Sequence, residues 1–585
     1  MQFVELLNDA SPKVREYVLD RILEMRLYGT IEMLQKRLEV EDSASLLDKT
    51  SDVLERLYLS QEESMTYEHI ELLVGSRDRE KRAYAAKVLG QIVTEETLPL
   101  LTDLIRDIEP KVRLQAIKSA AKVHRPELWP FLTDNLSNPI YQSAATSSLV
   151  AIGVDVLDAL ERSFYKSGAT TESLSRLVKI MGAIGGDKAI ELLLAKITFP
   201  DTQVVKQVLL SLHKCGFQSS ESSFSRVFQA LETNIGNILW NMAAIEEIPE
   251  GTAAYLKTAL EEENQDNFET LYLLLALAYE PSSIEKIKEN IETGTSESIG
   301  YAVELLELFV AEELKVILFP VLEDIPVNDK IRQLQNYYPR FPLTPVELMI
   351  QIINRDYNNI SKWTKACAIA AYGQMEGVKV NDDLIANLFN PDPLMREATA
   401  VVVYGIDPEA YHEAGKRIAS KVKRELDYLV TGSKERKIQQ LVQKTIFLKE
   451  LPSLSQLKWT ILVDLARELE LQYCQSDECL LEKATISSVG LYIVVEGEVR
   501  LQSKGNVLET FGPGSIVGEM LFLDGDDSQT ELVTTTPAKV FSMSKENLFE
   551  LLYRYNELTH IIIDAINPRF DISNEEVTVK AEPIN

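Results

Sequence analysis

The feature that most constrains the fold of this chain is a helical pattern that recurs through residues 1–415. Each copy has a short polar turn, then a basic residue, then an Ala-rich amphipathic helix that often ends at Gly. The copies are SPKVREYVLDRI, DREKRAYAAKVLGQI, EPKVRLQAIKSAAKV, NPIYQSAATSSLVAIG, FPDTQVVKQVLLSLHKCG, NNISKWTKACAIAAYGQM and PDPLMREATAVVVYGI. Arg82 and Arg113 lie 31 positions apart, and so do Lys365 and Arg396.

Each repeat unit of 31 positions is long enough for two helices and a turn, but neither helix alone can bury its apolar face. Stacked copies share one continuous core, so the pattern predicts an α-solenoid over residues 1–415. The units resemble HEAT repeats of a short type, since the usual HEAT period is about 40–47 residues. We expect the recurring Arg or Lys to bond turn carbonyls of a neighbouring unit. Between Glu221 and Pro345 the pattern weakens, and we expect degenerate units there.

A different pattern occupies the last quarter of the chain, where short alternating strands are separated by glycine turns. It comprises LYIVVEGEVRLQ from Leu491, an FGPG turn, IVGEM and AKVFSM, and the helical segment KENLFELLYRY follows. Gly518 at the entrance to a short helix leaves backbone N–H groups open to an anion, and Glu519 can accept hydrogen bonds from hydroxyls. These groups are suited to a sugar phosphate.

These landmarks resemble the cyclic-nucleotide-binding domain of the catabolite activator and of the protein kinase A regulatory subunit. The resemblance implies an α+β domain with a jelly-roll-like β-roll over residues 438–566, in which IFLKELPSLSQLKWTILVDLAREL forms the lead-in helices. It also implies that Glu519 holds the ribose hydroxyl and that an arginine further along pairs with the cyclic phosphate. The candidate nucleotide pocket consists of Gly518, Glu519, Met520, Ser528 and Gln529.

The phosphate half of this pocket departs from the family pattern. The arginine position falls on or next to Ser528, and no Lys or Arg occurs between Glu519 and Thr536. Three carboxylates crowd the same loop: Asp524, Asp526 and Asp527. A guanidinium matches phosphate oxygens, whereas carboxylates repel them. The sequence therefore favours a degenerate domain that binds no cyclic nucleotide and needs no cofactor. Binding of cyclic AMP or cyclic GMP through Glu519 and backbone amides is the alternative.

The net charge, the cysteines and the length of the apolar segments exclude several classes of function. A net charge of −30 argues against a nucleic-acid role, because phosphate backbones are held by a surplus of Lys and Arg. Four dispersed cysteines fit a reducing compartment, and we expect Cys474 and Cys479 to be small packing residues. The longest strongly apolar run, LYLLLALAY from Leu271, is too short to span a bilayer. We expect a cytoplasmic protein, and any contact with a membrane should be peripheral, at the inner face.

The sequence shows no nucleophile with a base, no phosphate loop and no metal-ligand cluster, so we expect a protein that is not an enzyme and holds no metal. The acidic stretch Glu261–Glu263 is expected to be solvated in a loop or at a helix end. The four tryptophans are expected to fill core: Trp129, Trp240, Trp363 and Trp459.

The main shift in composition is a basic run in an acidic chain, GKRIASKVKRELDYLVTGSKERK. It predicts a linker helix over residues 416–437, between the solenoid and the β-roll. A polar tail at residues 567–585 follows the β-roll. A solvated helix is the simpler interpretation of the run. Contact with anionic lipid headgroups or an acidic partner is the alternative.

The segments NFETLYLLLALAYEP and YAVELLELFVAEELKVILFPVLE, with the short HEAT units and the terminal domain, resemble the soluble tail of bacterial ADP/ATP-translocase-type membrane transporters. The apolar pattern FVELL begins at Phe3, directly after Met1 and Gln2 and without a capping unit, which favours a piece of a longer protein over a free-standing relative. The sequence predicts a non-enzymatic scaffold or regulatory module whose solenoid binds a protein partner. A cyclic-nucleotide sensor that uses Glu519 and the regulatory tail of a nucleotide transporter are the alternatives.

Overall fold

The computed structural model describes residues 4–9, 11–38, 41, 44–63, 67–249, 254–432, 434–480, 489–503, 506–518 and 530–563. The chain divides into two units, one of Met1–Thr198 with Gln203–Phe217 and one of Phe199–Thr202 with Gln218–Asn585. The described residues are mainly helical as far as Glu468, and the first strand begins at Glu470. The predicted fold class, a helical repeat array followed by an α+β domain, is confirmed.

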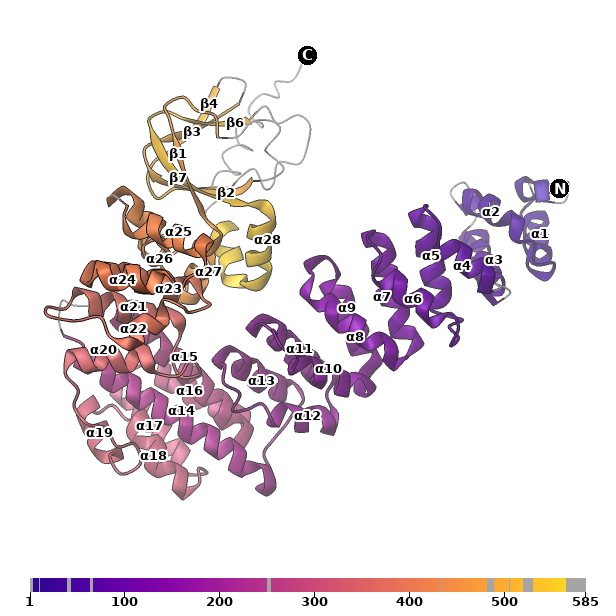
Figure 1. Ribbon diagram of the computed structural model, residues 1–585. Coiled ribbons are helices and arrows are strands. Elements are labelled where there is room, and N and C mark those ends of the chain that lie inside the picture. The colour runs from indigo at the N-terminus through magenta and orange to yellow at the C-terminus, as the bar shows by residue number, and fades with distance from the viewer. Residues whose placement is uncertain are drawn as a thin grey trace, which may run out of the picture. The chain divides into compact units, whose positions relative to one another are not determined.

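The first unit consists of helices joined by short turns. They are η1 (Val4–Asn8), α1 (Pro12–Glu24), η2 (Tyr28–Thr30), α2 (Ile31–Leu38), α3 (Ala44–Glu63), α4 (Tyr67–Val74), α5 (Arg79–Leu89), α6 (Leu98–Ile105), α7 (Pro110–Val123), η3 (Pro126–Leu128), α8 (Trp129–Asp134), η4 (Asn135–Ser137), α9 (Pro139–Ile152), η5 (Gly153–Val156), α10 (Leu157–Phe164), α11 (Thr171–Ile184), α12 (Gly186–Leu194) and α13 (Thr202–Lys214). From α4 onward they form five pairs. The second helices of these pairs, α5, α7, α9, α11 and α13, line up along one side of the stack (Figure 1).

Small residues let consecutive second helices pack closely. A Cβ atom on Gly182 of α11 would lie 2.5 Å from the Cβ atom of Ser211 on α13, and one on Gly90, directly after α5, would meet Ser119 of α7 in the same way. The Ser211 hydroxyl donates to the carbonyl of Val178 at 3.2 Å. Glycine at these positions removes the side chain that would hold the backbones apart, so the stacking expected from the Ala-rich pattern is direct.

Two of the recurring basic residues, Arg82 and Arg396, bind their own turns, and Arg82 also binds the next one. Arg82 Nη1 donates to the carbonyl of Ser76 at 2.9 Å, and its Nε pairs with Asp107 Oδ2 of the following turn at 2.7 Å. Arg396 Nη1 likewise donates to the carbonyl of Asn390, six residues earlier, at 2.7 Å. The expectation that these side chains bond carbonyls of a neighbouring unit is therefore wrong for both. A helical side chain points back toward the helix N-terminus, which brings the guanidinium onto the preceding turn.

One stretch of the described chain, residues 139–164, is long and apolar enough to cross a membrane by length and composition alone. Gly153 interrupts it with a φ of 79°, so the stretch consists of α9, η5 and α10 rather than one helix. Only glycine adopts this left-handed conformation without strain. The apolar side chains of α9 and α10 instead fill the core of the repeat stack, as buried Leu149 and Leu160 illustrate.

The helices of the second unit continue to residue 468. They are α14 (Glu221–Glu247), α15 (Ala254–Ala278), α16 (Pro281–Glu292), α17 (Ser296–Glu307), α18 (Glu312–Leu322), α19 (Val327–Leu334), α20 (Pro345–Asn354), α21 (Lys362–Gln374), α22 (Asp382–Asn387), α23 (Pro393–Ile406), α24 (Pro408–Gly415), α25 (Ser420–Val430), η6 (Lys434–Gln439), α26 (Leu441–Glu450) and α27 (Trp459–Glu468). The weakly patterned segment is helical, as expected, but it opens with two long helices, α14 and α15, that pack against each other.

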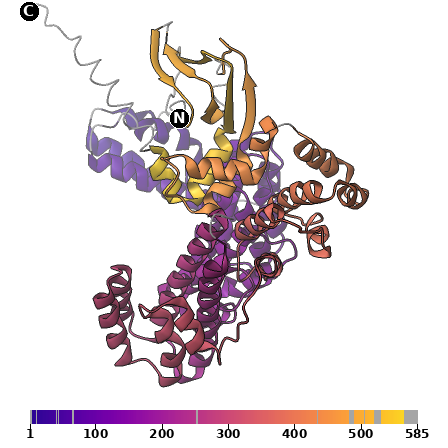
Figure 2. The same ribbon diagram turned by 90° about the vertical axis from the view of Figure 1, so that its left-hand side faces the viewer.

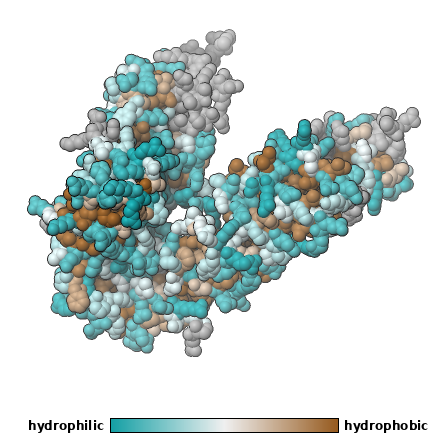
Figure 3. Space-filling model, in the orientation of Figure 1, coloured by the Kyte–Doolittle hydropathy of each residue, from teal (hydrophilic) through white to brown (hydrophobic). Residues whose placement is uncertain are grey.

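The basic run at 416–437 contributes α25 and the beginning of η6. Leu426 is buried, and Lys423 pairs with Asp427 on the same helix while its Nζ lies 4.8 Å from the ring centroid of Tyr411. Figure 3 shows hydrophilic residues over α25 beside a hydrophobic area over α22 to α24. One face of α25 is therefore packed and the other solvated. Its role as a linker between domains stays a prediction.

The strands of the β-roll form two antiparallel sheets. They are β1 (Glu470–Cys474), β2 (Val489–Glu496), β3 (Val499–Ser503), β4 (Asn506–Phe511), β5 (Ile516–Val517), β6 (Thr530–Thr534) and β7 (Ala538–Ser544), and helix α28 (Lys545–Arg554) follows. The sheet orders are β1-β7-β2-β5 and β4-β3-β6, with Ile493 opposite Phe541 and Leu501 opposite Leu532. In both ribbon views the strands lie on one side of α26, α27 and α28 (Figure 1, Figure 2).

Several packing predictions can be checked in this structure. Cys474 is buried, as expected, but Cys479 is exposed, so its prediction as a packing residue is wrong. It lies in an isolated bridge to Val533, after β1 has ended, where the chain has reached the surface. The tryptophans Trp129, Trp363 and Trp459 are buried core residues, whereas Trp240 is only partly buried.

Candidate functional site

The structure describes only one edge of the predicted nucleotide pocket. Gly518 follows β5 and is buried, whereas Glu519, Met520, Ser528 and Gln529 lie outside the described residues. The interior of the roll beside Gly518 is filled by a cluster of ten buried residues that includes Val517. Tyr492 of this cluster donates its hydroxyl to the carbonyl of Leu480 at 2.9 Å, and burial raises the pKa of that hydroxyl to about 12.

A second candidate site lies where α26 and α27, the lead-in helices of the β-roll, rest on α15, α21 and α23. We call this contact the junction. The indole rings of Trp363 on α21 and Trp459 on α27 stack with centroids 4.7 Å apart, and Tyr255 of α15 meets Trp459 edge-on at 6.0 Å. A single hydrophobic cluster runs from Ala244 on α14 to Ile562 beyond α28. The solenoid end and the β-roll therefore share one core.

Carboxylates of the solenoid cap both lead-in helices. Neither Gln440 before α26 nor Lys458 before α27 makes a side-chain cap. Instead, Glu397 on α23 accepts from the N–H of Leu441 at 3.0 Å, and Glu262 on α15 accepts from the N–H of Trp459 at 2.8 Å. The first N–H groups of a helix lack intrahelical partners and carry a partial positive charge, so an anion there stabilises the helix.

The neighbouring carboxylate on α15 caps a third helix. Glu263 accepts from the N–H of Ser361 at 2.6 Å and from the hydroxyl of Thr364 at 2.8 Å, at the start of α21. The prediction that Glu261–Glu263 is a solvated loop or helix end is thus wrong for two of its residues, which lie inside α15. Consecutive residues of an α-helix point about 100° apart, so Glu262 and Glu263 reach different helices. No local sequence signal marks these caps, because each partner lies about a hundred or more positions away.

Burial disfavours the ionised form of all three capping glutamates. It raises the pKa of Glu262 to about 7, against the hydrogen bond from Trp459 and the charge of Lys449, which lower it. Burial also raises the pKa of Glu263 and of Glu397, although the hydrogen bonds they accept act in the opposite direction. Desolvation is the dominant cause in each case, which is the expected effect of a low-dielectric surrounding on an acid.

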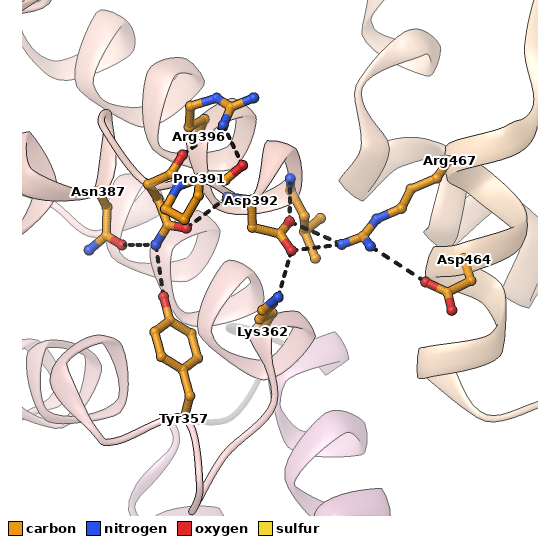
Figure 4. A network of polar contacts seen from close by, with 10 residues as sticks. Tyr357, Lys362, Asn387, Pro391, Asp392, Arg396, Asp464 and Arg467 are labelled. Atoms are coloured by element: carbon orange, nitrogen blue, oxygen red, sulfur yellow. Dashed lines mark hydrogen bonds and ion pairs between the residues drawn. The ribbon is translucent and has the colours of Figure 1, made fainter. Parts of the chain in front are cut away.

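An ion-pair network runs alongside the caps (Figure 4). Asp392, the N-cap of α23, accepts from the N–H of Leu394 at 2.9 Å, from Lys362 Nζ at 2.9 Å and from Arg467 Nη2 of α27 at 3.0 Å. Burial opposes the ionisation of Asp392, but the hydrogen bond from Lys362 and the charge of Arg467 outweigh it and lower the pKa of this carboxyl. Figure 4 shows the carboxylate between the two cations.

The same network reaches helix α28 at the far side of α27. Arg467 Nη1 lies 3.6 Å from Asp464 Oδ1, and Asp464 Oδ2 accepts from the hydroxyl of Tyr555 at 2.6 Å and from Arg554 at 3.2 Å. Burial beside Asp464 raises the pKa of the Tyr555 hydroxyl. A continuous path of polar contacts therefore joins Asp392 on the solenoid to the helix that follows the last strand.

A groove of about 740 Å³ opens next to the junction, between α25 and the α27–β1 segment. Its charged lining mixes both signs, with Lys421, Arg424 and Lys444 near Glu425 and Glu470. Lys444 already has a partner inside the protein, since its Nζ donates to the carbonyl of Leu469 at 2.6 Å. Among the described residues, no group of three His, Cys, Asp or Glu side chains is placed to hold a metal ion.

Comparison with known families supports both halves of the predicted architecture. The family of HEAT repeats matches residues 68–153, and the family described as the cyclic nucleotide-binding domain matches residues 471–555. The first match covers α4 to α9, and the second begins in β1 and ends just after α28. No curated protein matches the chain.

Three solved structures illustrate the similarity, and each matches between 21% and 27% of this chain. The sensor domain of the transcriptional regulator DNR from Pseudomonas aeruginosa is 15% identical, with a TM-score of 0.20, over 21% of this chain and 91% of that one. The regulatory subunit of a cAMP-independent protein kinase A from Trypanosoma cruzi, bound to guanosine, is 21% identical, with a TM-score of 0.21, over 27% and 57%. A cyclic nucleotide-binding domain from Methylobacillus flagellatus is 18% identical, with a TM-score of 0.21, over 25% and 86%. Similarity at this level concerns the fold and assigns no ligand.

Proposed function

We propose that this chain, which joins HEAT repeats to a C-terminal domain of the cyclic-nucleotide-binding type, is a non-enzymatic cytoplasmic scaffold. The repeats bind a protein partner, and the β-roll serves as a structural cap on the end of the helical array. The domain does not respond to cyclic nucleotide in this proposal. Helical repeat arrays present extended surfaces suited to protein partners and need terminal units that cover their last apolar face.

The capping of α26 and α27 by Glu397 and Glu262 carries this proposal. A sensor domain must change the arrangement of its helices when ligand binds, and the ligand must differ in affinity for the two arrangements. Here both lead-in helices begin on solenoid carboxylates, and Trp459 stacks inside the shared core. Moving them would break two caps and an aromatic stack, which favours a permanently docked domain.

Titration calorimetry of the full chain with cyclic AMP and cyclic GMP tests the absence of a nucleotide response. We expect no saturable heat below millimolar ligand. Micromolar binding would overturn the capping role and support the alternative, a cyclic-nucleotide sensor, for which the family match over 471–555 is the supporting observation. In that event Glu519→Ala should abolish binding, and Glu557→Ala, which alters an exposed carboxylate of the same domain, should not.

The resemblance to the soluble tail of ADP/ATP-translocase-type transporters remains a proposal that rests on sequence alone. In that setting the chain would be a regulatory part attached to a membrane domain. Reading the coding region in frame upstream of Met1 tests it. A series of hydrophobic spans there would support the transporter tail, and a clear translation start at Met1 would remove it.

A further inference from the structure

The two sets of helices in the first unit carry opposite charge. The second helices α5, α7, α9, α11 and α13 contain twelve Lys or Arg residues and only two carboxylates. The first helices α4, α6, α8, α10 and α12 contain two basic residues and eight carboxylates. Positive charge is therefore concentrated on one side of the repeats in a chain whose net charge is −30.

Part of this positive charge is used inside the repeats. Arg82 binds its own turn and Asp107, as described above. Arg113 Nε donates to Asn135 Oδ1 at 2.7 Å, and Arg176 Nη1 donates to the carbonyl of Leu136 at 2.8 Å. These arginines are structural, and the remaining lysines decide what the face can bind.

Five lysines on the second helices are exposed and make no hydrogen bond or ion pair with any described residue: Lys81 on α5, and Lys118, Lys122, Lys179 and Lys214 on α7, α11 and α13. Lys118 and Lys179 belong to one row of equivalent exposed positions, which also contains Lys87, Ser147 and Leu210. The row members Lys118, Ser147, Lys179 and Leu210 lie 29, 32 and 31 positions apart in sequence. We call the part of this surface on α7, α9, α11 and α13 the basic face; it consists of Lys118, Lys122, Ser147, Lys179, Leu210 and Lys214. Leu210 is 44% exposed, so the face ends at an apolar side chain.

We propose that the basic face binds an acidic protein segment that also carries an apolar side chain. This inference rests on the proposed scaffold function and names the chemistry of its partner. Carboxylates spaced along a peptide would meet Lys118, Lys122 and Lys179, and the apolar side chain would cover Leu210. Complementary charge accelerates such encounters and sets their register.

The spacing of the lysines favours a protein segment over a nucleic acid. Duplex DNA presents one negative charge about every 1.7 Å of its axis, and binding scales with the number of phosphates that are neutralised. Helix α9 lies between α7 and α11 and contains no charged residue. The lysines of α7 and α11 are therefore separated by a whole helix that offers no cation, where the axes of neighbouring helices are about 8–10 Å apart.

Fluorescence anisotropy with the full chain tests this proposal. The probe is a fluorescein-labelled peptide of Glu, Gly and Leu, and labelled oligothymidylate is the competing probe. The variant combines Lys118→Glu, Lys122→Glu and Lys179→Glu. A matched control combines Arg226→Glu, Lys257→Glu and Lys286→Glu, which make the same change in net charge at exposed positions of α14, α15 and α16.

We expect the wild type and the control to bind the peptide, and the basic-face variant to bind at least about tenfold more weakly. Added salt should weaken the wild-type complex. Equal affinity in all three proteins, no binding by the wild type, or tighter binding of oligothymidylate would each overturn the proposal. A Lys→Gln version of the variant, checked by circular dichroism, separates loss of binding from loss of fold. The nucleotide calorimetry tests the β-roll in the second unit, whereas the anisotropy experiment tests the basic face in the first unit. A failure of the proposed cap role can therefore be distinguished from a failure of the basic-face proposal.

Discussion

The carboxylate of Glu262 accepts a hydrogen bond from the N–H of Trp459, across 197 positions of sequence, and so caps the helix whose first side chain stacks on Trp363. Two kinds of interaction thus meet at one residue of the β-roll. The cap orients α27, and the indole stack places it in the shared core. The junction is a property of the folded chain, and its strength can be measured residue by residue.

Trp459→Ala should weaken the junction by about 3–5 kcal/mol, because it removes a large buried side chain and leaves a cavity next to Trp363. Hydrogen exchange followed by mass spectrometry should show lost protection in α21, α26 and α27. Trp129→Ala removes an equally large buried side chain from the first unit and is the control. If Trp459→Ala left protection in α21 unchanged, the two helices would not share a core.

The junction should become weaker as the pH rises, because the buried carboxyl group of Glu262 then ionises. Its pKa is about 7 in the folded chain against an ordinary value of 4.5, so the folded state binds more protons between these values. Stability contributed by this group is therefore full below about 4.5 and is lost as the pH rises toward 7, by about 2–3 kcal/mol after allowance for screening.

Glu262→Gln should flatten this part of the pH profile, since the amide oxygen still accepts from Trp459 but cannot ionise. Urea unfolding between pH 5 and 8 measures the slope. Glu261→Gln, at the exposed neighbouring position of α15, should leave the slope unchanged. An unchanged slope in Glu262→Gln would mean that another group titrates in this window.

Asp392→Asn should destabilise the second unit by about 2 kcal/mol at neutral pH, because it leaves Lys362 and Arg467 without their shared carboxylate. Since the pKa of Asp392 is lowered, its contribution is present above the ordinary value of 3.8 and is lost as the pH falls through the folded value. A double-mutant cycle with Arg467→Met isolates the pair. A coupling energy near zero would show that the ion pair contributes nothing to the junction.

Gly182→Ala should destabilise the first unit by about 1–3 kcal/mol, because the added Cβ would meet Ser211 at 2.5 Å. The same substitution at Gly405, where no atom lies within 4 Å, should instead stabilise its helix by about 0.5–1 kcal/mol. Thermal unfolding of both variants measures the contrast. A neutral or stabilising effect of Gly182→Ala would indicate that α11 and α13 do not pack at this position.

The predicted repeats and β-roll could be read from the sequence because both depend on local patterns. The 31-residue spacing of Arg82 and Arg113 reflects helical units that each need a neighbour, and the alternation in the segment from Leu491 reflects strands with one buried face. The nucleotide pocket was located by its glycine and glutamate, but only Gly518 of that set is described. Its ligand therefore stays a prediction.

Tertiary structure alone decided how the acidic stretch at 261–263 and the basic residue Arg467 are used. In sequence, Glu262, Glu263 and Arg467 look like any solvated charge. Folding brings Glu262 to the start of α27 and Asp392 to Arg467, pairs that lie 197 and 75 positions apart. Periodicity determines which face of an element is apolar. It cannot determine which distant helix end will need a carboxylate, because the direction of an unpaired N–H is set only when helices from separate parts of the chain pack together.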